Sequence, residues 1–137
     1  MKTLLDSSVF LEVALNQPGS KKAGKHVQDA IDGKTSAVVS AVCLLEVKYK
    51  VLRERGEENA IRSVEAIKMI PGIEIIPATS DICEAAASLK HKYYTKERQI
   101  SNADVIHLAT AITAGCGKII TGDPDFKDIE EMEAEIY

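Results

Sequence analysis

The chain has 137 residues, and we expect one domain, residues 1–137, that buries most of its apolar surface and needs no disulfide to fold. Its net charge of −4 and its lack of tryptophan argue against a large basic nucleic-acid surface and against a base-stacking platform. The three cysteines, Cys43, Cys83 and Cys116, are odd in number and widely spaced, which argues against a disulfide framework and a zinc knuckle.

The apolar segments are too short for export or membrane insertion. Asp6 interrupts the first of them after two apolar residues, and no later run approaches the roughly 18 residues that a membrane span requires. We therefore expect a soluble, cytoplasmic protein with reduced thiols and no membrane partner. The acidity is concentrated in residues 123–137, which hold seven acidic residues and one lysine, so the preceding residues carry a small positive excess.

Strands and helices alternate along the chain. A buried strand over Lys2–Asp6 opens it, and Ser7 and Ser8 can cap the helix that follows. Apolar periodicity, capping residues and helix-breaking residues predict six helices, over Val9–Leu15, over Lys21–Asp32 after Ser20, from Ser40 through Arg55, over Glu57–Ile70, from Thr79 or Ser80 onward, and from Ser101 to Gly115. Three further strands are predicted, at Ala37–Val39, Ile73–Ile76 and Lys118–Thr121, and the last of these is expected to be the final strand of the chain.

This alternation predicts an α/β fold, a three-layer α/β/α sandwich with a short parallel sheet and right-handed crossovers. In such folds, ligands bind beyond the carboxyl ends of the strands, where the strand order reverses. Two acids lie there by sequence, because Asp6 ends the first strand and Asp123 follows the last.

Three acidic residues each have an ordinary structural explanation. Asp6 can form an Asx-turn at the end of its strand. Asp104 stands three residues after Ser101, which fits a capping box at the start of a helix. Asp123 precedes Pro124, a common way to open a helix. Taken singly, none of the three requires a functional role.

Glu46 has no such explanation. It lies inside an apolar helical segment, with Val42 at position i−4 and Tyr49 at position i+3 on its own face of the helix. A carboxylate in this setting usually reaches a metal, a cation or a cleft, and the alternative is a solvent-accessible position at the rim.

The four acids become chemically informative if the fold brings them into one crevice. Two unit charges about 4 Å apart repel by about 4 kcal/mol at an effective dielectric constant near 20, so such a cluster must bind cations or take up protons. Ligands that are all oxygen select hard ions such as Mg²⁺ or Mn²⁺ over zinc.

Taken in order and spacing, these motifs resemble the PIN domain over nearly the whole chain. The matching features are Asp6-Ser7-Ser8 after a strand, Glu46 in the helix after Ser40, Asp104 opening Ala103-Asp104-x-x-x-x-Ala109, and Thr121-Gly122-Asp123-Pro124-Asp125-Phe126. The small stand-alone members, which include the VapC-type toxins of prokaryotic toxin–antitoxin pairs, are the most similar in length and pattern.

The resemblance implies a set of site residues. The acidic cluster of a metal-dependent ribonuclease would consist of Asp6, Glu46, Asp104 and Asp123, which would act in catalysis and hold Mg²⁺ or Mn²⁺. Asp125 is an alternative fourth acid, although Asp123 lies nearer to the strand end. The remaining candidates for supporting roles in the same cleft are Ser8, Thr121 and Asn102.

Other polar residues near these motifs leave more than one interpretation open. His107 is three residues after Asp104 and could be a general base, although a histidine with its hydrogen bonds satisfied at the edge of the core is more common. Two basic groups could flank the crevice and hold RNA phosphates, or could be solvated helix faces. They consist of Lys48, Lys50, Arg53 and Arg55, and of Lys90, Lys92, Lys96 and Arg98.

The sequence therefore predicts a Mg²⁺- or Mn²⁺-dependent endoribonuclease that hydrolyses RNA phosphodiester bonds. The resemblance further implies a homodimer and a cognate antitoxin whose C-terminal segment enters the crevice. The alternative is a PIN-like scaffold that binds RNA or protein without catalysis. A phosphatase of the haloacid dehalogenase type ranks lower, because Ser8 stands where that chemistry needs a second Asp.

Overall fold

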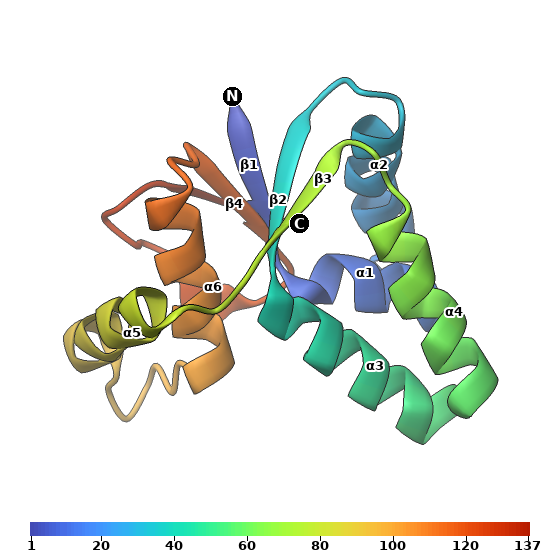
Figure 1. Cartoon of the computed structure of the whole chain (residues 1–137). Coiled ribbons are helices and arrows are strands. Elements are labelled where there is room, and N and C mark those ends of the chain that lie inside the picture. Colours follow the sequence, from blue (N-terminus) through green and yellow to red (C-terminus); the bar gives the residue numbers. More distant parts are fainter.

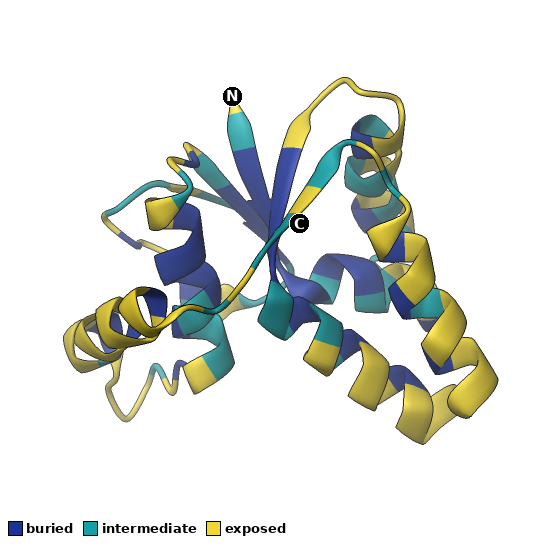
Figure 2. Cartoon of the chain, viewed as in Figure 1, coloured by how far each residue is buried: buried dark blue, intermediate teal, exposed yellow.

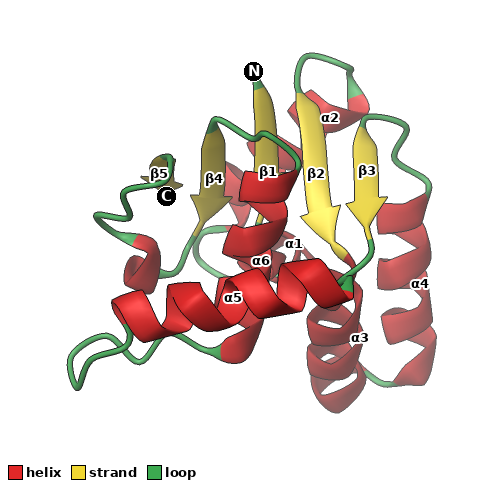
Figure 3. Cartoon of the chain, turned by 60° about the vertical axis from the view of Figure 1, so that its left-hand side comes forward, coloured by secondary structure: helices red, strands yellow, loops and turns green.

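The computed structural model describes residues 1–137 and contains a parallel sheet of five strands in the order β3-β2-β1-β4-β5. Figure 3 shows neighbouring strands running in one direction, with their carboxyl ends at the same edge. The strands are β1 (Lys2–Leu5), β2 (Ser36–Ser40), β3 (Ile73–Ile76), β4 (Lys118–Thr121) and β5 (Glu133–Ile136).

Six α-helices and one short 3₁₀ helix connect the strands, in two layers that sandwich the sheet (Figure 1). The first four helices, α1 (Ser7–Ala14), α2 (Ser20–Ile31), α3 (Ala41–Arg55) and α4 (Glu57–Lys68), cover one face. The other face is covered by α5 (Ser80–Tyr93), α6 (Asn102–Thr113) and the 3₁₀ helix η1 (Pro124–Phe126). The predicted three-layer α/β/α fold is confirmed.

Alternation along the strands builds a core on each side of the sheet. Leu4, Val38 and Ile119 pack toward α5 and α6, and the next residue in each of the three strands packs toward the other helical layer. Both faces are thus covered, as parallel sheets require. Figure 2 shows the buried central strands and the exposed outer sides of α3, α4 and α5. None of the helices has the length and apolarity that crossing a bilayer requires.

The strand β5 corrects one prediction, because Lys118–Thr121 is followed by a further strand. The acidic residues Glu133 and Glu135 suggest from sequence that this segment belongs to an acidic tail. In the structure β5 pairs with β4 at the edge of the sheet, and Glu135 forms ion pairs with Lys118 (3.0 Å) and with His26 of α2 (2.9 Å). Charged residues are common on edge strands, where they discourage pairing with other chains.

The start of the first helix is also different from the prediction. Helix α1 begins at Ser7, so Asp6 is the residue that precedes it, and Ser7 and Ser8 lie in its first turn. Neither serine caps the helix. Their hydroxyls contact acidic side chains instead. By contrast, Ser40 and Ser101 cap α3 and α6 as predicted.

One glycine is required by close packing between a turn and a helix. Gly72 precedes β3, and a Cβ atom there would lie 2.2 Å from the backbone oxygen of Ala30, near the end of α2. We expect Gly72→Ala to lower the free energy of unfolding by about 1–3 kcal/mol, because backbone must move to relieve the clash. Urea denaturation measures this change in the free energy of unfolding.

Gly24→Ala is the control, because Gly24 lies inside α2 with no atom closer than 3.8 Å to the added Cβ. This variant should raise the free energy of unfolding by about 0.5–1 kcal/mol. Equal urea midpoints for Gly72→Ala and wild type would contradict the expectation.

Candidate active site at the carboxyl edge of the sheet

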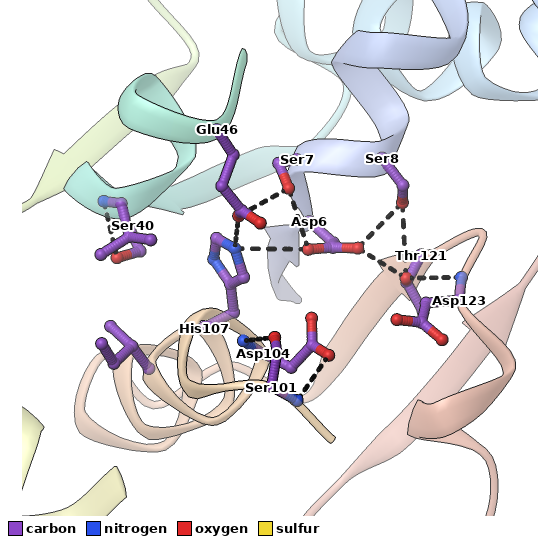
Figure 4. Close-up of polar contacts among 12 residues, drawn as sticks. Asp6, Ser7, Ser8, Ser40, Glu46, Ser101, Asp104, His107, Thr121 and Asp123 are labelled. Carbon is purple, nitrogen blue, oxygen red and sulfur yellow. Dashed lines mark hydrogen bonds and ion pairs between the residues drawn. The ribbon is translucent and has the colours of Figure 1, made fainter. Parts of the chain in front are cut away.

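The strand order places two acids side by side at the edge where ligands bind in such folds. The chain continues from β1 to β2 on one side, and β4 lies on the other side of β1, so the strand order reverses next to β1. Asp6 follows β1, and Asp123 follows β4. Helices α3 and α6 bring Glu46 and Asp104 to the same edge, as Figure 4 shows.

Asp6 accepts hydrogen bonds from hydroxyl groups of the helix that follows it, α1, and of the neighbouring strand, β4. One of its carboxylate oxygens, Oδ2, accepts hydrogen bonds from Ser8 Oγ (2.9 Å) and Thr121 Oγ1 (2.7 Å). The other, Oδ1, lies 3.4 Å from His107 Nε2. Asp6 is only 3% exposed, so these contacts replace the water that the carboxylate loses on folding.

Glu46 reaches a basic side chain, the imidazole of His107, at the cleft. Its Oε1 accepts hydrogen bonds from His107 Nε2 (2.6 Å) and from Ser7 Oγ (2.8 Å). Burial alone would raise the pKa of Glu46. The hydrogen bond and charge of His107, together with the hydrogen bond from Ser7, outweigh burial, so the pKa is lowered. Glu46 is therefore ionised at neutral pH.

His107 is the functional candidate that the sequence undervalued. Its side chain is fully buried, and its Nε2 lies between Glu46 and Asp6. Since ionised carboxylates only accept hydrogen bonds, Nε2 must carry the proton. Burial lowers the pKa of His107, but the hydrogen bond to Glu46 and the charges of Asp6 and Glu46 raise it above its ordinary value overall. The more common interpretation, a histidine with its hydrogen bonds satisfied, is met at Nε2 only, because Nδ1 is buried without a partner. Through Nε2 the side chain contacts two of the acids.

Asp104 combines a capping role with a place in the acidic cluster. Its Oδ2 accepts a hydrogen bond from the Ser101 backbone (3.2 Å), and Ser101 Oγ accepts one from the Asp104 backbone (3.1 Å), which completes the predicted capping box. Its other oxygen accepts no hydrogen bond from the protein. Burial and the charges of Asp6 and Asp123 raise the pKa of Asp104 to about 6.

Asp123 and Asp125 lie next to Asp104, in a group separate from Glu46 and His107. Thr121 Oγ1, which donates to Asp6, accepts a hydrogen bond from the Asp123 backbone (2.9 Å), and Asp123 Oδ1 accepts one from the Asp125 backbone (2.9 Å). Oxygens of Asp104, Asp123 and Asp125 all lie within 4.8 Å of one another. Burial and the neighbouring acids raise the pKa of Asp123. Both aspartates stay candidates for the fourth acid.

A sequence model of the PIN domain matches residues 3–132. The chain belongs to the PIN domain family.

Solved structures agree with this assignment at the level of the fold. The chain resembles VapBC2 from Rickettsia felis (TM-score 0.75, 18% identity, 98% of each chain covered) and the sarcin–ricin loop-cleaving toxin VapC20 from Mycobacterium tuberculosis (TM-score 0.74, 18% identity, 95% of this chain and 98% of that chain covered). It also resembles FitAcB from Neisseria gonorrhoeae (TM-score 0.71, 18% identity, 97% and 96% covered). A comparison with curated proteins found no match.

The carboxylate oxygens at the carboxyl edge of the sheet are metal ligands that fit a hard divalent cation. The acids lie in two neighbouring groups, one with Asp6, Glu46 and His107 and one with Asp104, Asp123 and Asp125. No lysine or arginine forms an ion pair with any of them, so the imidazole of His107 is their one basic partner among protein groups. Burial first, and then the charges of the neighbouring acids, raise the pKa values of Asp104 and Asp123. Carboxylate oxygens without protein donors, as on Asp104, are the ligands that Mg²⁺ and Mn²⁺ prefer.

Some residues singled out in the sequence lie outside this cluster. Asn102 is exposed, and its Oδ1 accepts a hydrogen bond from Lys90 of α5 (2.6 Å), so it does not join the acids. Lys92 forms ion pairs with Glu130 (2.9 Å) and Glu131 (2.7 Å). Part of the predicted basic flank is therefore neutralised by other side chains of the protein.

Proposed function

We propose that this PIN protein is a ribonuclease that acts in the cytoplasm and uses Mg²⁺ or Mn²⁺ held by Asp6, Glu46, Asp104 and Asp123. The observation that carries the proposal is the placement of these acids in two neighbouring groups at the carboxyl edge of the sheet, with the imidazole of His107 as their one basic protein partner. When bound, the divalent ion supplies an activated water and neutralises charge on the phosphate.

The protein groups around the acids hold them in place for this role. Ser8 and Thr121 each donate a hydrogen bond to Asp6 and each accept one from the loop after β4, at Gly122 (2.9 Å) and Asp123 (2.9 Å). The two hydroxyls thereby connect Asp6 to the loop that carries Asp123. His107 fixes the orientation of Glu46, and the hydrogen bond from the Ser101 backbone fixes that of the Asp104 carboxylate. Such outer contacts keep metal ligands preorganised.

The test is cleavage of single-stranded RNA by the purified protein in Mg²⁺, Mn²⁺ or EDTA. We expect cleavage with either ion and none in EDTA, because the acids alone repel the phosphate. Calorimetric titration with Mg²⁺ provides an independent readout. A protein that neither binds Mg²⁺ nor cleaves RNA would instead support the alternative of a non-catalytic scaffold that binds RNA or protein.

We further propose that the protein is the toxin of a toxin–antitoxin pair and forms a homodimer. The similar structures include VapBC complexes and FitAcB, and the M. tuberculosis protein among them is described as a toxin that cleaves the sarcin–ricin loop. An antitoxin segment that enters the crevice with a basic side chain would pair with the acids in place of a metal. Co-expression with the product of an adjacent short gene tests this pairing, and a protein that is harmless when expressed alone would count against the toxin role.

A further inference from the structure

A pocket of about 500 Å³ adjoins the acidic cluster on the side of the loop after β4. Gly122 forms part of its wall, and the Gly122 backbone donates a hydrogen bond to Ser8, which in turn donates to Asp6. The opposite wall comes from the segment that joins α1 to α2 and from the first turn of α2. The pocket therefore begins directly beside the residues that hold Asp6 and Asp123.

The lining of this pocket carries an excess of positive charge. Lys21 and Lys22 are exposed and form no ion pair. The one acid in the wall, Glu12, has Oε2 engaged by the backbone of Gly19 (2.9 Å). The hydroxyl of Tyr137, also in the wall, is buried and has no hydrogen-bond partner. Because the Tyr137 hydroxyl has no access to solvent, the two ammonium groups are the donors left for an anion.

The polar pocket on the other side of the cluster is different. It has a volume of about 570 Å³ and contains Arg98 and Lys127, but its wall also includes the acids Glu97 and Asp125. Lys92, its third cation, is neutralised by Glu130 and Glu131. Of the basic residues that the sequence placed beside the acids, Lys92 is compensated by ion pairs here, whereas Lys21 and Lys22 form none.

We infer that the pocket containing Lys21, Lys22 and Gly122 holds a phosphate group of the RNA strand, next to the phosphate at the acids. The inference rests on the proposed function. A strand placed with one phosphate at Asp6 and Asp123 must overcome the repulsion of the acids, and unpaired lysines at the adjoining wall supply the compensating attraction. Such contacts position a strand without reading its sequence.

The test is the salt dependence of binding of a fluorescent single-stranded RNA, measured by anisotropy with Ca²⁺ in place of Mg²⁺ and with the RNA checked for intactness. The variant Lys21→Gln/Lys22→Gln should bind more weakly, and its slope of log affinity against log salt concentration should fall by about 1. Mg²⁺ binding by calorimetry should stay unchanged, because the acids are untouched.

The matched control is Lys34→Gln/Lys68→Gln, which makes the same change in charge near the amino ends of β2 and β3, at the opposite edge of the sheet. Its salt slope should equal that of wild type. If the Lys21/Lys22 variant keeps the wild-type slope, or if Arg98→Gln/Lys127→Gln alone lowers it, the inference is overturned while the proposed nuclease stands. A wild-type protein that binds no RNA would overturn both.

Discussion

Replacement of Asp104 by Asn is expected to abolish RNA cleavage in Mg²⁺ or Mn²⁺ and to leave the fold intact. The Asn side-chain oxygen can still accept the hydrogen bond from the Ser101 backbone, so the capping box is largely kept. The carboxylate oxygen that has no protein donor is replaced by an amide NH₂, which cannot bind a metal. Loss of an outer contact to a metal ligand typically costs 10–100-fold, and Asp104 is proposed as a ligand itself, so we expect its loss to lower the cleavage rate by about 100-fold or more.

The same variant should have a signature in stability that does not depend on activity. In the folded protein the pKa of Asp104 is about 6, above its ordinary value of 3.8, so the folded state binds this proton more tightly than the unfolded state. Stability of the metal-free protein therefore falls as pH rises from about 4 to about 6. Asp104→Asn lacks this loss. In EDTA it should resist urea better than wild type at pH 7, with the difference shrinking toward pH 4.

A matched control separates the two roles of Asp104. Ser101→Ala removes the other half of the capping box and should cost about 1 kcal/mol of stability, while the carboxylate and the cleavage activity are retained. Wild-type cleavage rates in Asp104→Asn, or loss of cleavage in a folded Ser101→Ala variant, would contradict a metal-binding role for Asp104.

Removal of the His107 imidazole is expected to impair both stability and cleavage. In His107→Leu, Glu46 loses its 2.6 Å hydrogen bond, and Asp6 loses the imidazole 3.4 Å from its Oδ1. We expect a loss of about 1.5–3 kcal/mol in the free energy of unfolding, as for hydrogen bonds to charged groups, and a 10–100-fold lower cleavage rate because Glu46 is no longer oriented. Urea denaturation and the RNA cleavage assay measure the two effects.

His107→Gln is the informative partner of this variant. Its amide nitrogen can take the place of Nε2 and donate to Glu46, and it forfeits nothing at Nδ1, which is buried and has no partner in the structure. We expect Gln to recover part of the activity and stability that Leu loses. If Gln and Leu behave alike, side-chain volume and not the hydrogen bond is what His107 contributes.

The fold and the acids could be predicted because their signals are local. Each strand and cap lies within a short stretch of sequence, and Glu46 was informative because an interior carboxylate on an apolar helix has few structural explanations. The convergence of Asp6 and Asp123 followed from the rule that parallel strands end at one edge.

Contacts between distant segments could not be predicted in this way. His107 and Glu46 are 61 positions apart, and nothing near His107 in the sequence indicates its partner. The strand β5 was missed because Glu133 and Glu135 suggest a solvated tail until Lys118 and His26 are known to lie beside them. For the same reason the sequence emphasised basic residues such as Lys92, whose charge is neutralised by Glu130 and Glu131, over Lys21 and Lys22.

The most direct test of a shared metal site is a crystal structure of the protein grown with Mn²⁺, with anomalous scattering used to locate the ion. The account predicts an anomalous peak at the carboxyl edge of the sheet, within coordination distance of oxygens from Asp104 and from Asp123 or Asp125, with Asp6 and Glu46 beside it. It would be contradicted by data that show Mn²⁺ bound elsewhere, or by no peak among these acids at a Mn²⁺ concentration that supports RNA cleavage.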